Sequence, residues 1–382
     1  MKKSFCLFCA NYLPNLGGVE RYVYNLSKQL VKHGHNVTVV TSNVFQLPSY
    51  EISEEGIEIY RLPCYNVMKG RYPILKKNDL FKELDSKLCS KHFDIAVINA
   101  RFYIHSVYAA KFAYKNNIPM LTIEHGSSHL SVNNKFLDFF GAIYEHILTA
   151  VLKKYCKDYY GVSQAACDWS GHFGIKSKGT LYNAIDINNI EKLKENKVCS
   201  YREKYSVPED ATVITYTGRL VKEKGAYELA QAFGRQSNKN SYLFIAGDGE
   251  QMCKIAEISS QNKRIITLGK IDFEHVVALL SESDVFCLPT VYPEGLPTSI
   301  LEAAALRNLI ITTMVGGAKE LVNDKSLGIL LDDNTVEKVA SALEKALSDE
   351  KFRANATQKC YDRLLECFTW EKTAEKLEGL VE

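Results

Sequence analysis

Residues 4–10 read SFCLFCA, residues 36–41 read NVTVVT, and a helical pattern over residues 19–33 lies between them. Each apolar run is short and rich in large or β-branched side chains, as is typical of a buried strand. Gly34 follows the helical pattern at the position where a glycine commonly ends a helix. The stretch therefore predicts a βαβ unit, whose two strands run parallel with the helix as their crossover.

The same alternation continues along the chain and then starts again. Further strands of the first series are predicted at residues 57–61, 94–98, 119–123 and 158–162. A polar stretch over residues 187–210 leads to a second series, which opens with TVITYT at residues 212–217. Its later strands are predicted at residues 242–246, 265–268, 284–288 and 309–312, and its helices at residues 225–236, 250–261, 273–282 and 298–307. The fold class is thus α/β, with two doubly wound, Rossmann-like domains that bind ligands at the carboxyl ends of their strands.

The composition is that of a globular protein with an uneven distribution of charge. The 382 residues suffice for two domains. In residues 1–180, 22 Lys and Arg stand against 14 Asp and Glu, a net charge of +8, whereas the rest of the chain carries −6. A basic first half fits an anionic partner such as a membrane surface or a lipid diphosphate, but ordinary surface charge explains it equally well. We expect no nucleic-acid partner.

We expect a cytoplasmic protein, and the charge leaves open a peripheral contact with the inner membrane surface. The apolar run after Lys3 stops at Asn11, at the short limit for a signal peptide, and no stretch reaches the roughly 20 apolar residues that span a bilayer. One Cys-x-x-Cys occurs among the 11 cysteines, from Cys6 to Cys9 in the predicted first strand, so core packing is favoured over a redox or metal site. No histidine cluster completes a zinc site, and scattered cysteines are typical of a reducing cytosol.

The segment PEGLPTSILEAAA at residues 293–305 is the most informative candidate for a binding site. A helix that begins near Pro297 points free N–H groups and a positive dipole end into the preceding loop, which suits a phosphate. Thr298 and Glu302 are four residues apart and share one face of that helix, so a phosphate beside Thr298 puts a ribose within reach of Glu302. Glu294, at the mouth of the loop, is positioned to contact a sugar. Taken alone, a capped and exposed helix with ordinary acidic residues explains the segment equally well.

Two cations follow the first strand of the second series, in TGRLVKEKG at residues 217–225. Arg219 offers a planar fork and Lys224 a point charge, and together they would neutralise a diphosphate and the charge that develops on it as a leaving group. The alternative is a solvated loop in which Lys222 and Lys224 face water.

Two weaker signals follow strands of the first series. Gly17 and Gly18 lie between the first strand and its helix, where backbone N–H groups can approach a phosphate closely, although a plain turn is the more frequent explanation. The pair does not fit Gly-x-Gly-x-x-Gly, which argues against an NAD-dependent oxidoreductase. Most histidines are structural, but His125 follows the predicted strand 119–123 at its carboxyl end, which favours a role at the site.

Together these segments resemble the family 4 glycosyltransferases of the GT-B fold, and the resemblance extends through nearly the whole chain. Its most specific element is the Glu-x7-Glu pattern of Glu294 and Glu302. The supporting segments are GGVE at 17–20, YNAID at 182–186, GRL at 218–220 with Lys224-Gly225, AGDGE at 246–250 and FTWE at 368–371.

The last of these segments is similar to the start of the closing helix of the family, which crosses back to the first domain. The resemblance therefore implies an N-terminal, acceptor-side domain of residues 1–182 plus 369–382. It implies a C-terminal, nucleotide-sugar-binding domain of residues 183–368, with the two domains facing each other across a cleft.

The resemblance also implies a role for each site residue. The residues implied for donor binding are Gly17, Gly18, Arg219, Lys224, Lys270, Ile271, Glu294, Gly295, Leu296, Thr298 and Glu302. The residues implied for catalysis are His125, Glu294, Arg219 and Lys224. Glu302 would bind the ribose, Lys270 and Ile271 would meet the nucleobase, and His125 would contact the donor sugar. Pro297 has no N–H, so the backbone contacts of the loop fall to its neighbours Leu296, Thr298 and Ser299.

The implied chemistry is transfer with retention of anomeric configuration. The leaving diphosphate helps to take the proton of the acceptor, and no protein nucleophile is required. The chain contains no Asp-x-Asp, the acidic pair with which many metal-dependent glycosyltransferases hold a divalent ion. We therefore expect neither a metal ion nor another cofactor, because Arg219, Lys224 and helix dipoles would supply the positive charge. The expected donor is a nucleotide sugar, with UDP favoured over GDP.

Two segments are candidates for the acceptor side. Residues 133–157 predict a helix rich in Phe, Tyr and Leu that ends in Lys153, Lys154 and Lys157. Such a helix suits a lipid-linked acceptor at a membrane, but packing in a large core gives the same pattern and is slightly favoured. Residues 65–72 predict a basic, aromatic loop. The expected activity is transfer of a hexose or N-acetylhexosamine to a saccharide acceptor, lipid-linked in our interpretation, in surface polysaccharide biosynthesis; the alternative is a GT-B protein that binds or scaffolds without turnover.

Overall fold

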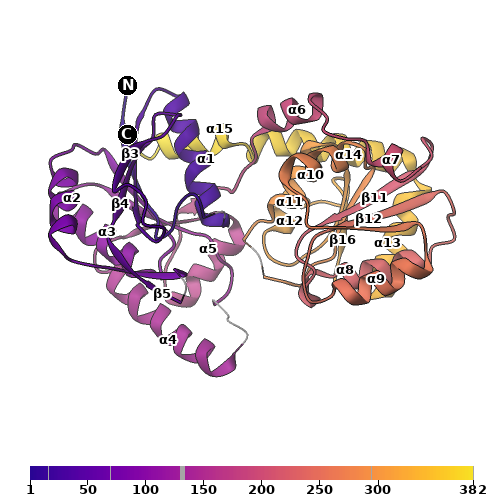
Figure 1. The fold of residues 1–382 in the computed structure, drawn as a ribbon, viewed down its shortest axis with the longest axis horizontal. Coiled ribbons are helices and arrows are strands. Elements are labelled where there is room, and N and C mark those ends of the chain that lie inside the picture. The colour runs from indigo at the N-terminus through magenta and orange to yellow at the C-terminus, as the bar shows by residue number, and fades with distance from the viewer. Residues whose placement is uncertain (16, 69, 130–133, 294, 382) are drawn as a thin grey trace. The chain divides into compact units, whose positions relative to one another are not determined.

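The structure, a computed structural model, describes residues 1–15, 17–68, 70–129, 134–293 and 295–381, which form two compact units (Figure 1). The first unit consists of Met1–Asn183 and Trp370–Glu382, and the second of Ala184–Thr369. Each unit is built around one main sheet with helices, as the alternating sequence pattern predicts.

In the first unit, described strands pair in the order β10-β9-β8-β7-β1-β2-β4-β3. The strands of this sheet are β1 (Ser4–Phe8), β2 (Asn36–Ser42), β3 (Tyr50–Ile52), β4 (Glu58–Leu62), β7 (Ile95–Asn99), β8 (Met120–Glu124), β9 (Asp158–Gly161) and β10 (Gly179–Thr180). Neighbouring strands are parallel except at the edge, where β3 runs antiparallel to β4. The helices are α1 (Gly18–Lys32), α2 (Asp79–Cys89), α3 (Ile104–Lys115), α4 (Lys135–Leu152), α5 (Gln164–Ser170), the short 3₁₀ helix η1 (Gly171–Phe173) and α15 (Trp370–Glu378).

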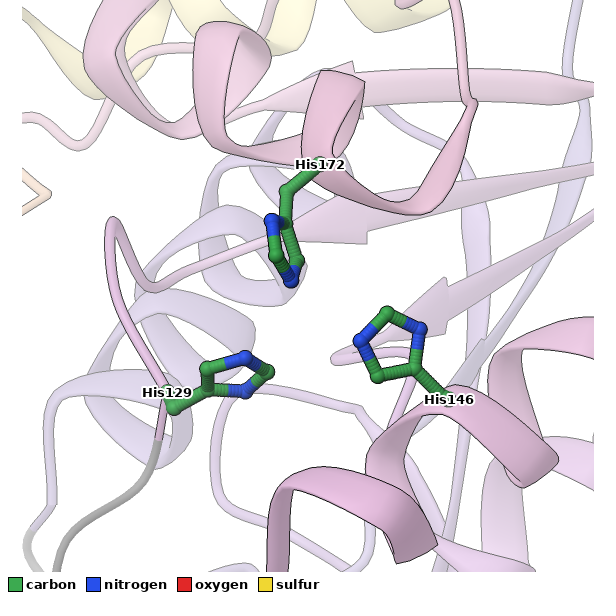
Figure 2. A group of neighbouring side chains, drawn as sticks. All are labelled: His129, His146 and His172. Carbon is green, nitrogen blue, oxygen red and sulfur yellow. The ribbon is translucent and has the colours of Figure 1, made fainter. Parts of the chain in front are cut away.

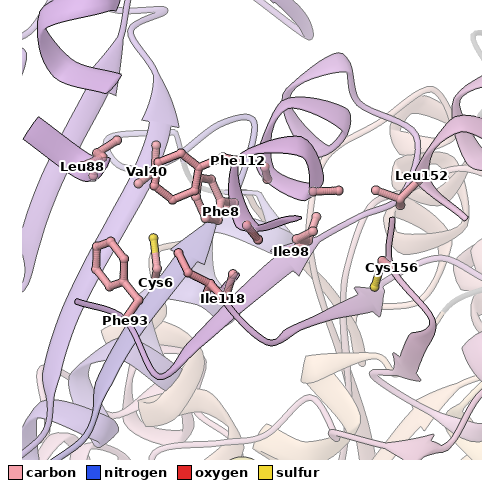
Figure 3. Packing of buried hydrophobic residues seen from close by; sticks show 14 of the residues in the cluster. Cys6, Phe8, Val40, Leu88, Phe93, Ile98, Phe112, Ile118, Leu152 and Cys156 are labelled. Carbon is pink, nitrogen blue, oxygen red and sulfur yellow. The ribbon is translucent and has the colours of Figure 1, made fainter. Parts of the chain in front are cut away.

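The core of the first unit explains why the opening strand is so apolar (Figure 3). Cys6 and Phe8 point from β1 into a cluster that also contains Val40 of β2 and Phe112 of α3. Cys6 and Cys9 are both fully buried and neither forms a disulfide. Burial raises the pKa of both thiols, so they remain protonated. Core packing, the favoured interpretation of this Cys-x-x-Cys, is confirmed.

In the second unit, described strands pair in the order β13-β12-β11-β14-β15-β16, and all neighbours are parallel. The strands are β11 (Thr212–Thr217), β12 (Ser241–Ala246), β13 (Ile265–Gly269), β14 (Val285–Leu288), β15 (Leu309–Thr313) and β16 (Ile329–Leu331). The helices are α6 (Ile187–Glu195), α7 (Tyr201–Lys204), η2 (Lys222–Lys224), α8 (Ala226–Gly234), α9 (Met252–Gln261), α10 (Phe273–Ser281), α11 (Thr298–Ala305), α12 (Ala318–Leu321), α13 (Val336–Ser348) and α14 (Glu350–Cys367).

Two segments contain elements that the sequence did not predict. The predicted loop 65–72 is largely an antiparallel hairpin, in which β5 (Cys64–Val67) pairs with β6 (Tyr72–Leu75). The polar stretch 187–210 contains α6 and α7, whose first turns are capped by the side chains of Asp186 and Ser200. The hairpin strands are too short to show a period, and α6 and α7 are polar helices that are marked by their caps rather than by an apolar pattern.

The last helix stays with the first unit, although its sequence follows the second. The Thr373 hydroxyl donates to the carbonyl of Tyr182 at 2.9 Å, and the ring of Trp370 meets Tyr22 of α1 edge to face. Within the described parts of the chain, no helix combines the length and apolar character needed to cross a membrane.

Candidate functional site

The carboxyl edge of the second sheet is formed by loops that pack backbone against backbone. The N–H of Leu220, after β11, donates to the carbonyl of Asp248, after β12, at 2.8 Å. A Cβ on Gly247 would overlap the carbonyl oxygen of Gly218, and both glycines have positive φ, +154° and +156°. Larger residues cannot take these positions without moving a loop. The AGDGE segment therefore fixes the loop that carries Arg219.

Arg219 and Lys224 lie beside the same aromatic ring. The guanidinium carbon of Arg219 is 5.4 Å and the ammonium nitrogen of Lys224 is 5.6 Å from the centroid of the Tyr292 ring. Lys224 is buried, with 8% of its surface exposed, so the solvated-loop alternative is wrong for it, whereas Lys222 is exposed. Burial, and secondly the charge of Arg219, lower the pKa of Lys224 to about 8. Burial and the neighbouring guanidinium both disfavour the charged form of Lys224, whereas a bound anion would favour it.

Backbone contacts hold the Lys224 loop against the chain after β14. A Cβ on Gly225, where φ is +75°, would overlap the carbonyl oxygen of Pro289. The N–H of Val291 donates to the carbonyl of Glu223 at 2.7 Å. The loop with the two cations and the loop that leads to α11 therefore form one surface.

Helix α11 begins at Thr298, directly after Pro297, as the sequence predicts. Thr298 is half-buried, and Glu302 is buried with 9% of its surface exposed, so the alternative of an exposed helix is wrong at this position. The preceding loop packs closely, because a Cβ on Gly317 would overlap the carbonyl oxygen of Gly295. Glu294, the first acid of the Glu-x7-Glu pattern, lies outside the described residues.

Two other residues implied by the resemblance lie at the end of the edge strand β13. Gly269 has φ of +67°, and its carbonyl accepts from the N–H of Gly247 at 2.8 Å. Lys270, the next residue, is exposed, and Ile271 packs at the border of a cluster that includes Phe244. A cation and an apolar side chain thus stand side by side at the carboxyl end of β13.

In the first unit, Gly17 and Gly18 lie at the start of α1, after β1. A Cβ on Gly17 would overlap the carboxylate of Glu20, whereas a Cβ on Gly18 would meet nothing within 4 Å. Glu20 is buried and accepts from the side-chain amide of Asn15 at 2.9 Å. Burial raises the pKa of Glu20, and its hydrogen bonds oppose that shift. Open space for an anion therefore lies at Gly18, while Glu20 occupies the side of Gly17.

His125 follows β8 and is held on two sides. Its Nε2 is 3.0 Å from the Oδ1 of Asn99, the last residue of β7, and its ring meets Tyr22 edge to face. The amide nitrogen of Asn99 donates to the carbonyl of Phe8 at 3.2 Å, which orients Oδ1 as the acceptor. His125 must then carry its proton on Nε2, leaving Nδ1 as the basic nitrogen. Burial lowers the pKa of His125 to about 3, so the ring is neutral at physiological pH.

A buried ion cluster fixes the backbone around His125. The Glu124 carboxylate accepts from the N–H groups of His125 and Gly126 at 3.0 and 3.1 Å. Arg101 lies between Glu124 and Glu145, at 2.9 and 3.1 Å, and all three side chains are at most 2% exposed. Burial raises the pKa of Glu124, an effect that the charge of Arg101 opposes. The sequence did not reveal Arg101, Glu145 or their ion pairing with Glu124, because contacts between residues far apart in sequence leave no local pattern.

The structure also shows a histidine cluster that the sequence did not reveal. His129, His146 and His172 come together in the first unit, with one ring nitrogen of each within 4.8 Å of the others. They are too far apart in sequence to match the short spacings of zinc motifs, so no pattern revealed them.

The sequence also did not reveal Tyr292, since a single tyrosine in a loop gives no signal.

The structure therefore brings the predicted residues into two sets, one in each unit. The described residues of the set in the second unit are Arg219, Lys224, Lys270, Ile271, Gly295, Leu296, Thr298 and Glu302. The set in the first unit consists of Gly17, Gly18 and His125. Both sets lie at the carboxyl ends of parallel strands, where α/β sheets bind their ligands.

Comparison with known proteins decides between the remaining interpretations. The family described as Glycosyltransferase Family 4 matches residues 16–189, and the family described as Glycosyl transferases group 1 matches residues 199–363. The chain is a family 4 glycosyltransferase of the GT-B fold. The two matches cover most of the glycosyltransferase, and the first ends six residues beyond the boundary between its two units.

Relatives of this glycosyltransferase share its full length at low identity. An uncharacterised glycosyltransferase of Methanocaldococcus jannaschii is 24% identical over 100% of this chain and 98% of its own. The GPI3 subunit of phosphatidylinositol N-acetylglucosaminyltransferase from Saccharomyces cerevisiae is 22% identical over 98% of this chain and 81% of its own. The crystal structure of Anabaena HepE in complex with UDP-glucose has a TM-score of 0.72 at 16% identity and covers 99% of each chain. The GT-B fold predicted from the sequence is confirmed.

Proposed function

We propose that this glycosyltransferase moves a hexose or N-acetylhexosamine from a nucleotide sugar to a saccharide acceptor, with retention of configuration and without a metal ion at the donor. The proposed acceptor is lipid-linked, and the proposed process is surface polysaccharide biosynthesis. The observation that carries the proposal is the pair of Arg219 and Lys224 beside the Tyr292 ring. Two cations at one sheet edge, one of them buried, suit a ligand with two phosphates.

In the second unit, the donor diphosphate would bind to these cations and to the first turn of α11. In the first unit, the N–H of Gly18 is the proposed anion contact. The first N–H groups of a helix have no acceptor within the helix, and the dipole adds positive charge at that end. A diphosphate would favour the charged form of Lys224, which burial disfavours.

The nucleoside would extend from the diphosphate along the same edge. Glu302 lies on α11 one turn from Thr298, so its carboxylate can accept hydrogen bonds from both ribose hydroxyls. Lys270 and Ile271, after β13, would meet the nucleobase, which needs an apolar surface with a polar edge. UDP is favoured over GDP, and the UDP-glucose bound to the fold neighbour HepE supports that choice.

In the first unit, His125 is the proposed contact of the donor sugar. The basic Nδ1 of the neutral imidazole can accept a hydrogen bond from a sugar hydroxyl, while Asn99 holds the ring in place. We propose that Glu294 contacts the same sugar, although it lies outside the described residues.

In the transfer step, the acceptor oxygen forms a bond to the anomeric carbon as the bond from that carbon to the diphosphate breaks. The acceptor proton passes to an oxygen of the leaving diphosphate, on the face of the sugar that the leaving group vacates. Negative charge grows on the diphosphate during this step, and Arg219 and Lys224 would stabilise it more strongly than they stabilise the intact donor. The proposed step needs no protein nucleophile and no metal ion bound to the donor.

The surface around α4 supports a lipid-linked acceptor. The aromatic side chains Phe136, Phe139 and Phe140 are 70%, 62% and 52% exposed, so core packing does not explain them. A cavity of about 330 Å³ opens between α4 and the β5–β6 hairpin, with Ile74 and Tyr144 among its lining residues. Contiguous exposed apolar surface of this kind marks a binding or membrane-contact site. The relative named for phosphatidylinositol acts, by its name, on a membrane lipid, which is consistent with such an acceptor.

Radiolabelled transfer from a panel of nucleotide sugars tests this proposal. We expect label from a UDP-sugar to enter a lipid-linked saccharide, and the Arg219→Ala variant to lose that transfer. Nucleotide-sugar binding without transfer or hydrolysis across the acceptor panel would instead favour the catalytically silent scaffold. A thermal-shift screen of the same donors ranks their affinities first, since a bound donor stabilises the folded state according to its concentration over Kd.

A further inference from the structure

The first unit holds three histidines whose rings converge (Figure 2). His129 lies in the segment after β8, His146 on α4 and His172 on η1. The ring of His172 is 5.1 Å from that of His129 and 5.1 Å from that of His146, measured between centroids. Three separate elements therefore direct imidazoles at one point, which the donor chemistry proposed above does not use.

The spacing of the ring nitrogens suits a single divalent ion after a small closure. One nitrogen from each histidine lies within 4.8 Å of the others. Zinc bound by histidine at about 2.0–2.1 Å in a tetrahedral site brings ligand nitrogens to about 3.3 Å from one another. Rotation of exposed side chains covers that difference, and His146 and His172 are both exposed.

A carboxylate stands behind one of the rings, as it does in many metal sites. The Nδ1 of His129 is 3.2 Å from the Oε2 of Glu145. When a histidine donates one ring N–H to a carboxylate, its other nitrogen is left as the ligand and its orientation is fixed. Glu145 is close enough to Nδ1 of His129 to accept this hydrogen bond once the ring turns on binding a metal, which would leave Nε2 as the ligand.

The charges below the cluster favour a cation. Arg101 is shared by two buried carboxylates, those of Glu124 and Glu145, so this group carries one negative charge in excess when all three are ionised. The guanidinium carbon of Arg101 lies 3.6 Å from the centroid of the Phe173 ring, next to His172 in sequence. A divalent ion bound to His129 would lie near the Glu145 carboxylate and would offset the excess negative charge of this group.

We propose that His129, His146 and His172 form a binding site for a divalent transition-metal ion of the zinc class, with the fourth position open to water or an exogenous ligand. Zinc and similar transition-metal ions bind neutral imidazoles well, whereas magnesium and calcium prefer oxygen ligands. The ion would tie the segment that carries His125 and His129 to α4 and η1. Its role is structural, so it does not enter the transfer step.

The test uses full-length protein without an affinity tag, since added histidines would bind metal themselves. We expect about one zinc ion per chain by mass spectrometry after metal loading and dialysis, and a Tm about 5–10 °C higher at a 100-fold excess of free zinc over Kd. The His146→Ala and His172→Ala variants should each bind zinc at least tenfold more weakly. The His92→Ala variant is the matched control, because His92 is an 81% exposed histidine of the same unit outside the cluster, and it should bind as the wild type does.

Zinc binding that is absent, or that survives in both the His146→Ala and His172→Ala variants, would overturn the proposal. Equal loss in the His92→Ala variant would mean scattered surface binding and would overturn it as well. Cobalt titration provides a second readout, since a three-histidine site should give the visible absorption bands of tetrahedral cobalt in the wild type and in His92→Ala only. Sugar transfer is measured separately in the presence of chelator, so a failure of this site leaves the proposed activity untouched.

Discussion

At Lys224, burial opposes the positive charge that a diphosphate requires. The pKa of this side chain, lowered to about 8 in the donor-free protein, makes its charge sensitive to mildly alkaline pH. Arg219, the neighbouring cation, keeps its charge throughout this range because a guanidinium does not deprotonate in proteins. Donor binding should therefore weaken, but not vanish, as the pH rises through about 8.

We predict that kcat/KM for the donor falls between about pH 8 and 10, and that the Lys224→Arg variant removes this fall. The stability of the donor-free protein should show the opposite trend. The pKa of Lys224 in the folded protein lies below its value in the unfolded chain, about 10.4. Between these two pH values the unfolded chain binds more protons than the folded protein. The contribution of Lys224 to the free energy of unfolding therefore rises with pH. Initial rates and Tm measured across this range check both trends. A flat kcat/KM profile in the wild type would contradict this account.

Substitutions at Glu302 and at His125 should have different effects. Glu302→Gln should raise the Kd for the nucleotide by about 10- to 100-fold, the loss of a charged hydrogen-bond acceptor, with a smaller effect on kcat. His125→Ala should mainly lower kcat, because the ring would contact the sugar rather than the nucleoside. The neutral His125 also predicts no loss of activity near pH 6.5 from its own titration. Nucleotide titration and steady-state kinetics separate the two effects, and equal loss of nucleotide binding in both variants would count against the assigned roles.

At the scale of single residues, the sequence could indicate which side chains have suitable chemistry, but not which of them contact one another. Arg219, Lys224 and Glu302 stood out because charged residues followed a strand or opened a helix. Tyr292 and Asn99 did not, since their roles arise from contacts with residues far away in sequence. Residue types reveal the candidate groups, whereas the fold decides which of them meet.

Among the elements, the loops after β11 and β12, which meet at Gly218 and Gly247, lead to a structural prediction. Gly247→Ala introduces a side chain at φ +154°, against the Gly218 carbonyl. The conformation alone costs about 1–3 kcal/mol, and the overlap must also displace the loop that carries Arg219. We expect a lower Tm and a donor KM raised at least tenfold.

The control for that prediction is Gly234→Ala at the end of α8, where an added Cβ meets nothing within 4 Å. This variant should keep the activity and stability of the wild type. Thermal unfolding and donor kinetics on both variants check the prediction, and a Gly247→Ala protein that behaves like Gly234→Ala would contradict the packing described.

The exposed face of α4 gives a prediction about the acceptor side. Replacing Phe139 and Phe140 with Ser removes two aromatic side chains, each worth about 1.5–3 kcal/mol when fully buried in an apolar phase. We expect binding to lipid vesicles, measured by sedimentation, to fall at least tenfold, with donor hydrolysis unchanged. Tyr114→Ser on α3 is the control, because Tyr114 is 63% exposed on a different helix. Unchanged vesicle binding in the double variant would remove the support for a membrane-associated acceptor.

Strong periodic patterns made most strands and helices predictable, and weak ones did not. TVITYT gave β11 with its bounds, because every side chain suits a strand buried on both faces. The β5–β6 hairpin and β16 were missed, since short pairs with exposed or mixed side chains carry no period long enough to recognise. Helix α4 ends at Leu152, five residues before the predicted end at 157, and the Lys153 ammonium donates to the carbonyls of Phe173 and Gly174.

For the whole molecule, repetition of the alternating pattern indicated two Rossmann-like domains, and the family matches agree. The three-histidine cluster remained hidden, since it needs the segment after β8, α4 and η1 to pack together before any spacing has meaning. The same holds for the buried group of Arg101, Glu124 and Glu145. Long-range clusters of this kind are products of the fold, and sequence order alone contains no local signal for them.

In the proposed reaction, two protein cations, and no metal ion, stabilise the diphosphate while the sugar keeps its anomeric configuration. The most direct measurement is transfer from a UDP-sugar in excess EDTA, with the anomeric configuration of the product determined by NMR. We predict undiminished transfer with retained configuration, and loss of transfer in the Arg219→Ala and Lys224→Ala variants. Activity that disappears in EDTA and returns with manganese, or a product of inverted configuration, would contradict it.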